Sequence, residues 1–229
     1  MNYFNKLFVG AIAMMAVTVT PGCSNEEQLG MEGVADATAP LNISVSNSLE
    51  TKVEWGGVIS GATFPDNSSL GLFVTKTADD AAYDTPYNNI QYTSSTSGGN
   101  QIWTASSSIL LTGTKANVYA YYPYDANYND ITKISIDVTE NKDVMWATPA
   151  TNIYNASPTA PLSMNHALSV IRFSLSKGDY SGTGSIESIS IQGDCMAKTC
   201  KLNAKTGEVS ITDQGAEIDF GTLGAAANL

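Results

Sequence analysis

The sequence predicts an all-β protein whose main domain is an antiparallel β-sandwich. Only 14% of the 229 residues are charged, and the runs of Glu, Lys and Leu that favour helices are missing. Short segments instead alternate apolar and polar residues with the two-residue period of a β-strand. Turn-forming stretches such as "TSGGN" and "NAKTG" separate these segments. Many short strands joined by such turns are typical of an antiparallel sandwich.

Residues 1–22 have the features of an export signal. Lys6 precedes an uncharged apolar run, Leu7–Val19, which is too short to span the roughly 30 Å hydrocarbon core of a bilayer. "TPGC" follows the run, and a cysteine at this place is typical of bacterial lipoproteins, in which the thiol of Cys23 would be acylated. An ordinary secretory signal that is cut nearby is the alternative. Residues 23–39 are small and polar and are predicted to form a flexible tether.

Strands are predicted from residue 40 onward. The first is marked by Leu41, Ile43 and Val45, which alternate with polar residues. Further strands are predicted at residues 70–76, 89–95, 101–106, 116–124, 131–139, 167–176, 186–193 and 207–212. No long segment after the export signal has the helical period, which is about 3.6 residues. The exported part of the chain is therefore expected to consist of strands and turns.

The ionisable residues argue against nucleic-acid binding and against catalysis. The net charge is −11 and Arg172 is the single arginine, so the cationic surface that would neutralise phosphates is missing. His166 is the single histidine, and no G-x-S-x-G, H-E-x-x-H or phosphate-binding glycine motif accompanies it. We therefore predict no enzyme, no catalytic residue, no cofactor and no metal site. His166 is predicted to stand at the entrance of the strand at 167–176 and to close a hydrogen-bond network there.

Two short motifs each have two interpretations. The segment "DANYND", Asp125–Asp130, places oxygen atoms as at the start of a calcium-binding loop, but the glycine and the glutamate that such a loop needs are missing. We interpret the segment as a set of Asx turns. Cys195 and Cys200 form a C-x4-C pair, which in an exported protein predicts a disulfide that closes a hairpin loop. Two free thiols are the alternative.

Four stretches of apolar and aromatic residues form a specific pattern. They are "TKVEWGG…SLGLFVTK" (51–76), "VYAYYPYD" (118–125), "KDVMWATPA" (142–150) and "MNHALSVIRFSLS" (164–176). In this order, over about 125 residues, they resemble the fimbrillin family, the lipoprotein-derived subunits of type V pili in Gram-negative anaerobes. In this family the histidine and the alternating residues after it are a strand signature. The resemblance therefore implies an architectural role for His166 and Arg172.

The resemblance implies a pair of transthyretin-like β-sandwich domains. Residues 40–180 would form the first domain, and residues 181–229 would begin the second. It also implies that a protease removes an N-terminal strand after a basic residue, here Lys52, where the family more often has Arg. A strand from another fimbrial subunit would fill the groove left behind. The resulting fimbria would lie at the cell surface, with a lipid on Cys23 as the anchor in the outer membrane.

The sequence also allows a second function. A stand-alone surface lipoprotein would bind glycans, or another host or bacterial surface ligand, through exposed aromatic residues such as Tyr121, Tyr122 and Tyr124. Packing of these tyrosines inside a strand is the alternative explanation for them. Self-assembly into polymers would favour the fimbrial subunit, and saturable sugar binding by a monomer would favour the second function.

Overall fold

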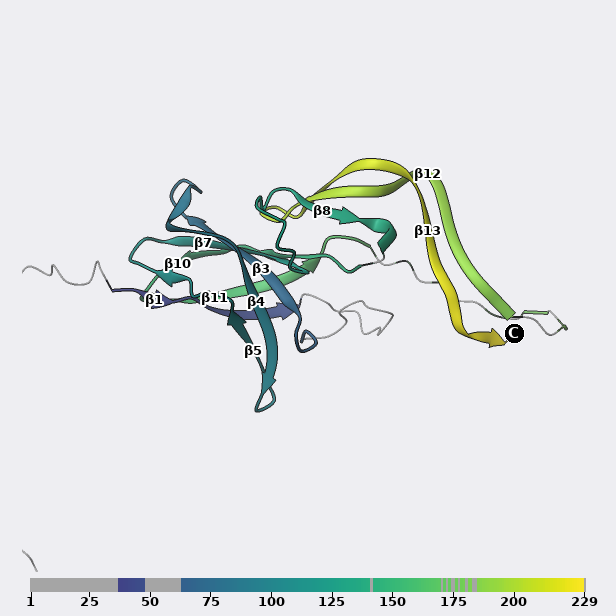
Figure 1. The fold of residues 1–229 in the computed structure, drawn as a ribbon, viewed down its shortest axis with the longest axis horizontal. Helices are drawn as coiled ribbons and strands as arrows, with labels where there is room; N and C mark the ends of the chain where they lie inside the picture. Colours follow the sequence, from purple (N-terminus) through teal and green to yellow (C-terminus); the bar gives the residue numbers. More distant parts are fainter. Residues whose placement is uncertain are drawn as a thin grey trace, which may run out of the picture. The chain divides into compact units, whose positions relative to one another are not determined.

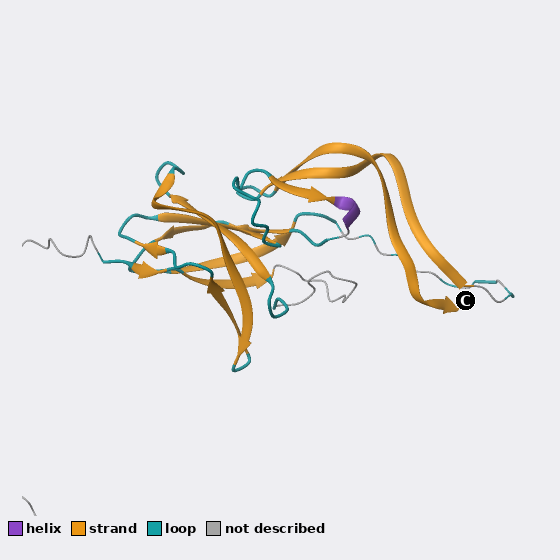
Figure 2. Ribbon diagram, in the orientation of Figure 1, coloured by secondary structure: helices purple, strands orange, loops and turns teal. Residues whose placement is uncertain are grey.

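The computed structural model describes residues 37–47, 63–140, 142–169 and 185–228, together with Ile171, Phe173, Ser176, Gly178, Asp179, Ser181 and Gly182. Nearly all of the regular structure in these residues is β-strand, and the helical element among them is a short 3-10 helix, η1 (Val138–Glu140) (Figure 2). The described residues contain no helix long and apolar enough to cross a membrane. The all-β class predicted from the sequence is confirmed.

The largest sheet has eight strands. Its order is β2-β11-β9-β7-β3-β4-β5, and β10 pairs with β7 beside this path (Figure 1). The strands are β2 (Asn42–Asn47), β3 (Ser69–Lys76), β4 (Ala82–Ser97), β5 (Asn100–Ala105), β7 (Ala116–Tyr122), β9 (Met145–Thr148), β10 (Ala150–Ile153) and β11 (Thr159–His166). All neighbours in this sheet are antiparallel except β2 and β11, which run parallel. The antiparallel character expected from the turn-rich sequence therefore holds for every pair but the one made by the N-terminal strand.

The central strands β3 and β7 are buried on both faces. Leu70, Leu72 and Val74 of β3 belong to one cluster of buried residues, which we call the inner core. Phe73 of β3 belongs to a second cluster on the opposite face, the outer core, together with Tyr121 of β7. Strands with two buried faces need continuous apolar runs in place of strict alternation. "LGLFV" and "VYAYY" are runs of this kind.

A second sheet covers the outer core. Its order is β13-β12-β8, from β8 (Ile134–Asp137), β12 (Ser185–Asn203) and β13 (Glu208–Asn228). Ile134 and Ile136 of β8 and Leu202 of β12 are buried in the outer core. Because β8 pairs with β12 from Leu202 to Thr199, strands from both sides of residue 180 share one sheet. A boundary between two sandwich domains at residue 180 remains a prediction.

The turn between β12 and β13 is fastened to the first sheet. The Lys205 ammonium pairs with the Asp80 carboxylate and lies 5.1 Å from the centre of the Tyr119 ring. Gly207 has a φ of 80° and lies against the Trp146 ring of β9, where a Cβ atom would collide with the indole. The turn predicted from "NAKTG" is therefore confirmed, and only glycine fits its last position without strain.

The strand predicted at residues 167–176 is wrong, because the actual strand lies about one strand length earlier in the sequence. The structure places the strand at Thr159–His166, as β11, and the described residues of 167–176 are not in a strand. Ala160, Leu162 and Met164 supply the buried side of β11. Pro161 occupies an exposed position between them and precedes the ladder with β9, which begins at Ser163. A missing N–H is tolerated at that point of a strand.

Replacing Gly71 by alanine is expected to lower the free energy of unfolding by about 1–3 kcal/mol. A Cβ atom on Gly71 would overlap the ring of Tyr121, which is completely buried. The Tyr121 hydroxyl donates to Asn89 Oδ1 at 2.8 Å, so the ring cannot turn aside without losing this bond. Urea denaturation measures the change. Gly113→Ala is the control, because nothing lies within 4 Å of the added carbon; equal stability of the two variants would contradict the packing described.

Candidate functional site

Residues 39–47, which we call the closing segment, complete the sandwich at its edge (purple in Figure 1). The first part, β1 (Ala39–Pro40), pairs antiparallel with β6 (Leu110–Leu111). The second part, β2, pairs parallel with β11, from Asn42 opposite Thr159 to Asn47 opposite Met164. The segment thus changes its partner at Leu41, and it joins two parts of the chain that do not pair with each other in the described sheets.

The side chains of the closing segment alternate between core and solvent. Leu41 is 5% exposed and belongs to the inner core, and Ile43 and Val45 are half-buried against it. Asn42, Ser44 and Ser46 are exposed, so the alternation predicted for the first strand is confirmed. Full burial of one aliphatic side chain stabilises a fold by about 1.5–3 kcal/mol, so Leu41 carries the largest share of this contribution.

Backbone bonds hold the closing segment on both sides of its change of partner. The Leu41 N–H donates to the Ile109 carbonyl at 2.8 Å, and the Asn42 N–H donates to the Pro158 carbonyl at 2.8 Å. The Tyr92 hydroxyl donates to the Leu41 carbonyl at 3.2 Å. Tyr92 is 2% exposed, and this burial raises the pKa of its hydroxyl to about 12. The hydroxyl therefore stays protonated and donates across the neutral range.

Two more tyrosines of β4 form hydrogen bonds with the backbone around β6, as a neighbouring strand would. The Tyr87 hydroxyl accepts from the Leu110 N–H at 2.9 Å and donates to the Leu110 carbonyl at 3.3 Å. The Tyr83 hydroxyl accepts from the Thr112 N–H at 3.0 Å and donates to the Thr114 carbonyl at 2.8 Å. One side of β6 is thus satisfied by phenol groups, and the other side pairs with β1.

The closing segment is an edge strand that leads to the predicted cleavage position. β2 stands at the end of the eight-strand order, with β11 as its neighbour. Four residues separate Asn47, the last residue of β2, from Lys52 in the sequence. Lys52, Cys23 and Arg172 all lie outside the described residues, so their predicted roles stay predictions.

His166 is paired with a carboxylate at the end of β11. Its Nδ1 lies 2.6 Å from Asp143 Oδ1, and the two side chains are 14% and 8% exposed. The Nε2 atom is buried and has no hydrogen-bond partner among the described residues. The Ala167 N–H donates to the Val144 carbonyl at 2.8 Å beside this pair. The histidine thus ties β11 to the chain before β9 through a carboxylate.

The structure does not form the disulfide expected between Cys195 and Cys200. Both thiols are free, with Cys195 exposed and Cys200 buried in the outer core. Both residues lie within the single strand β12, not across a hairpin. Five residues of extended chain span about 16 Å, whereas a disulfide needs Cα atoms within about 7 Å.

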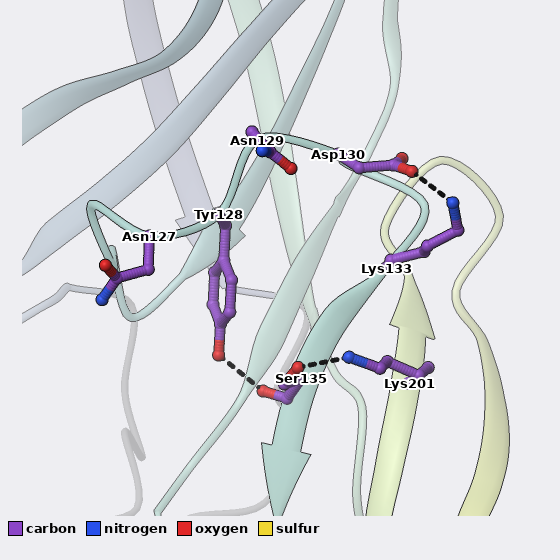
Figure 3. Close-up of a pocket in the computed structure, with 7 residues that line it drawn as sticks. All are labelled: Asn127, Tyr128, Asn129, Asp130, Lys133, Ser135 and Lys201. Carbon is purple, nitrogen blue, oxygen red and sulfur yellow. Dashed lines mark hydrogen bonds and ion pairs between the residues drawn. The ribbon is translucent and has the colours of Figure 1, made fainter.

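The "DANYND" loop uses its carboxylates to hold its own backbone. Asp125 Oδ1 accepts from the Asn127 N–H at 2.9 Å, and Asp130 Oδ1 accepts from the Thr132 N–H at 2.9 Å. These contacts confirm the Asx turns. The loop also lines a pocket of about 440 Å³ together with Lys133, Ser135 and Lys201 (Figure 3). Lys201 and Tyr128 both point to Ser135 in this pocket, with hydrogen bonds of 2.6 and 2.8 Å.

The tyrosines considered for glycan binding do not form an exposed surface. Tyr121 is completely buried, and its hydroxyl donates to Asn89 Oδ1. Tyr122 is half-buried, with its ring 5.3 Å from the ring of Phe64. Tyr124 is half-buried as well. The packing explanation for these residues is therefore correct, and the exposed aromatic platform is wrong, because the second sheet covers the face on which Tyr121 lies.

One family model and several crystal structures are similar to this chain. The model, described as fimbrillin-like, matches residues 57–228. A candidate cell adhesion protein from Bacteroides uniformis has a TM-score of 0.54 at 22% identity, over 72% of this chain and 68% of that one. A second one, from Bacteroides ovatus, has a TM-score of 0.45 at 17% identity, over 84% of this chain and 76% of that one. A fimbrial protein from Bacteroides ovatus has a TM-score of 0.35 at 21% identity, over 57% and 29%.

The first of these crystal structures supports the fold of the chain. At 22% identity the similarity is one of architecture. None of the curated protein sequences matches the chain. The family model covers the eight-stranded sheet from β3 onward and all of β12 and β13.

Alkylation of the native protein should label Cys195 and spare Cys200. Cys195 is exposed, whereas Cys200 is 3% exposed and its burial raises the pKa of the thiol, which lowers the fraction of reactive thiolate. Iodoacetamide treatment followed by peptide mass mapping measures both sites. Cys200 should become labelled after unfolding in urea without reductant. Protection of both thiols in the unfolded, unreduced protein would instead demonstrate a disulfide.

The free energy of unfolding is expected to fall as the pH rises from about 10 to about 12, with Tyr92 as one cause. Its pKa rises from the ordinary value of 10.0 to about 12 in the folded state, so folded protein holds a proton that unfolded protein releases. The stability from this group is complete below pH 10 and is lost through pH 12, by roughly 2–3 kcal/mol. Urea denaturation of wild type and Tyr92→Phe over this range checks it: their difference in stability should shrink, and a constant difference would contradict it.

Proposed function

This chain belongs to the fimbrillin-like family, and from that premise we propose that it is a structural or adhesive subunit of a cell-surface fimbria. The proposal is that the subunit is exported as a lipoprotein precursor and assembles by donor-strand exchange. The observation that carries the proposal is the closing segment, because residues 39–47 complete the sandwich from its edge and precede the predicted cleavage position at Lys52.

The closing segment has the properties of a replaceable strand. It is bound through backbone hydrogen bonds to β6 and β11, which any strand can make, and through alternate apolar side chains against the inner core. A cut after Lys52 would leave only these non-covalent contacts to hold it. Its loss would expose the Leu41 site and the unpaired edge of β11, and such an edge is a template for strand addition. A strand from a neighbouring subunit would restore both.

Anchoring at the outer membrane is the second part of the proposal. Cys23 follows a short export signal, and an acyl chain on this cysteine would hold the precursor at the membrane until assembly. A single chain anchors a protein only weakly, whereas the two or three acyl chains of bacterial lipoproteins hold it stably. The names of the similar proteins, a fimbrial protein and cell adhesion proteins from Bacteroides, fit a location at the cell surface.

The stand-alone glycan-binding lipoprotein is not proposed as a second function. It depended on exposed tyrosines, and the structure buries Tyr121 and half-buries Tyr122 and Tyr124. An adhesive subunit within a fimbria remains part of the main proposal. Its ligand would be recognised through other residues.

Mass spectrometry of the protein from cells that make it tests this function. The precursor should begin at Cys23 with the added mass of acyl chains, and the assembled form should begin at Val53. Unboiled samples should show polymer ladders on a gel, because exchanged strands resist dissociation. The variant Lys52→Ala should keep its N-terminal strand and lose the ladders.

The matched control for this experiment is Lys115→Ala, which removes another exposed lysine far from the closing segment in sequence. This variant should be processed and should polymerise like wild type. Wild-type protein that stays monomeric, keeps residues before Val53 and resembles Lys52→Ala in every assay would contradict assembly by strand exchange.

A further inference from the structure

The contacts of the closing segment are concentrated at one residue. Leu41 is where the segment leaves β6 and joins β11. Its N–H is bound by Ile109 and its carbonyl by the hydroxyl of Tyr92. Its side chain is 5% exposed, whereas Ile43 and Val45 on the same face are half-buried. One position therefore combines the deepest side chain of the segment with bonds to both of its backbone polar groups.

We propose that the position of Leu41 is the anchor of the groove: any strand that fills it must place an apolar side chain there and offer that residue's carbonyl to the Tyr92 hydroxyl. This proposal rests on the proposed exchange of strands and specifies the chemistry of the partner. The partner is a strand with an aliphatic residue, branched or unbranched, at the anchor. Two and four residues later it carries apolar side chains that become only half-buried, and the residues between these positions are polar.

The Tyr92 hydroxyl makes the anchor selective for register. A slip of one residue would turn Asn42 or Pro40 toward the inner core and would expose the aliphatic residues, since side chains in a strand alternate between its faces. The same slip would rotate the carbonyl of the anchor residue away from Tyr92. The hydroxyl would then be a buried donor without an acceptor, which costs free energy in addition to the lost apolar contact.

The inner core offers a matched control for Tyr92. Tyr87 lies on the same strand, β4, is 8% exposed, and also bonds through its hydroxyl to backbone groups. Its partner is Leu110 of β6, which belongs to the sandwich and not to the closing segment. A Tyr→Phe change at either position removes one hydroxyl from the same core. Only the change at Tyr92 removes a bond to the inserted strand.

The experiment measures uptake of labelled peptides by the full chain. The chain is folded first and then cut after residue 52 at an engineered protease site, and fluorescence anisotropy follows a peptide of residues 37–50. Leu41→Ala in the peptide should weaken its apparent affinity about 30-fold or more, because a buried leucine is lost. Ile43→Ala and Val45→Ala should each weaken it less than about tenfold, and Ser44→Ala should leave it unchanged.

The two tyrosine variants complete the experiment with the unsubstituted peptide. Tyr92→Phe in the protein should weaken uptake about fivefold, the worth of one ordinary hydrogen bond, and Tyr87→Phe should change it less than twofold. If the three aliphatic substitutions weaken the apparent affinity equally, or if the two tyrosine variants take up the peptide equally well, the anchor role of the Leu41 position is wrong. Strand exchange itself would still stand. No uptake of any peptide by the cut chain would overturn strand exchange itself, and the anchor with it.

Discussion

Burial of the β3–β7 pair on both faces is the constraint on which the rest of the structure depends. The inner face, with Leu72 and Val118, belongs to a core that Leu41 of the closing segment and tyrosines of β4 help to fill. The outer face, with Phe73 and Tyr121, requires β8 and β12. Because the second sheet supplies residues that cover the outer face, the two sheets share one core. β12 contributes to this core through Cys200 and Leu202, although residues 181–229 were predicted to begin a second domain.

The same constraint separates the centre of the sheet from its edge. β3 and β7 are paired along both sides with strands of the chain, and their side chains fill two cores. Among the described strands, the closing segment pairs on one side at each position, with β6 and then with β11, and it packs against the inner core alone. Its contribution is therefore confined to one edge and one core.

Local patterns in the sequence predicted those parts of the fold that depend on local order. The alternation around Ile43, the apolar run of β3, the turn before Gly207 and the Asx turns at Asp125 were all correct. The incorrect predictions concern features that depend on residues far apart in the sequence. β11 was missed because Pro161 lies within it, at a point that precedes the ladder with β9. The cysteines were assigned to a loop because nothing near "GDCMAKTC" shows that β12 continues through it, and Tyr121 looked exposed because the strands that cover it lie elsewhere in the chain.

The parallel pairing of β2 with β11 has a mechanical consequence. Six residue pairs form this ladder, and its hydrogen bonds lie across the direction in which the strand runs. A force applied along the closing segment would load all of these bonds together in shear. A hairpin pulled apart from its open end instead breaks one pair after another. The parallel ladder is therefore expected to resist a lengthwise pull better than it resists peeling from one end.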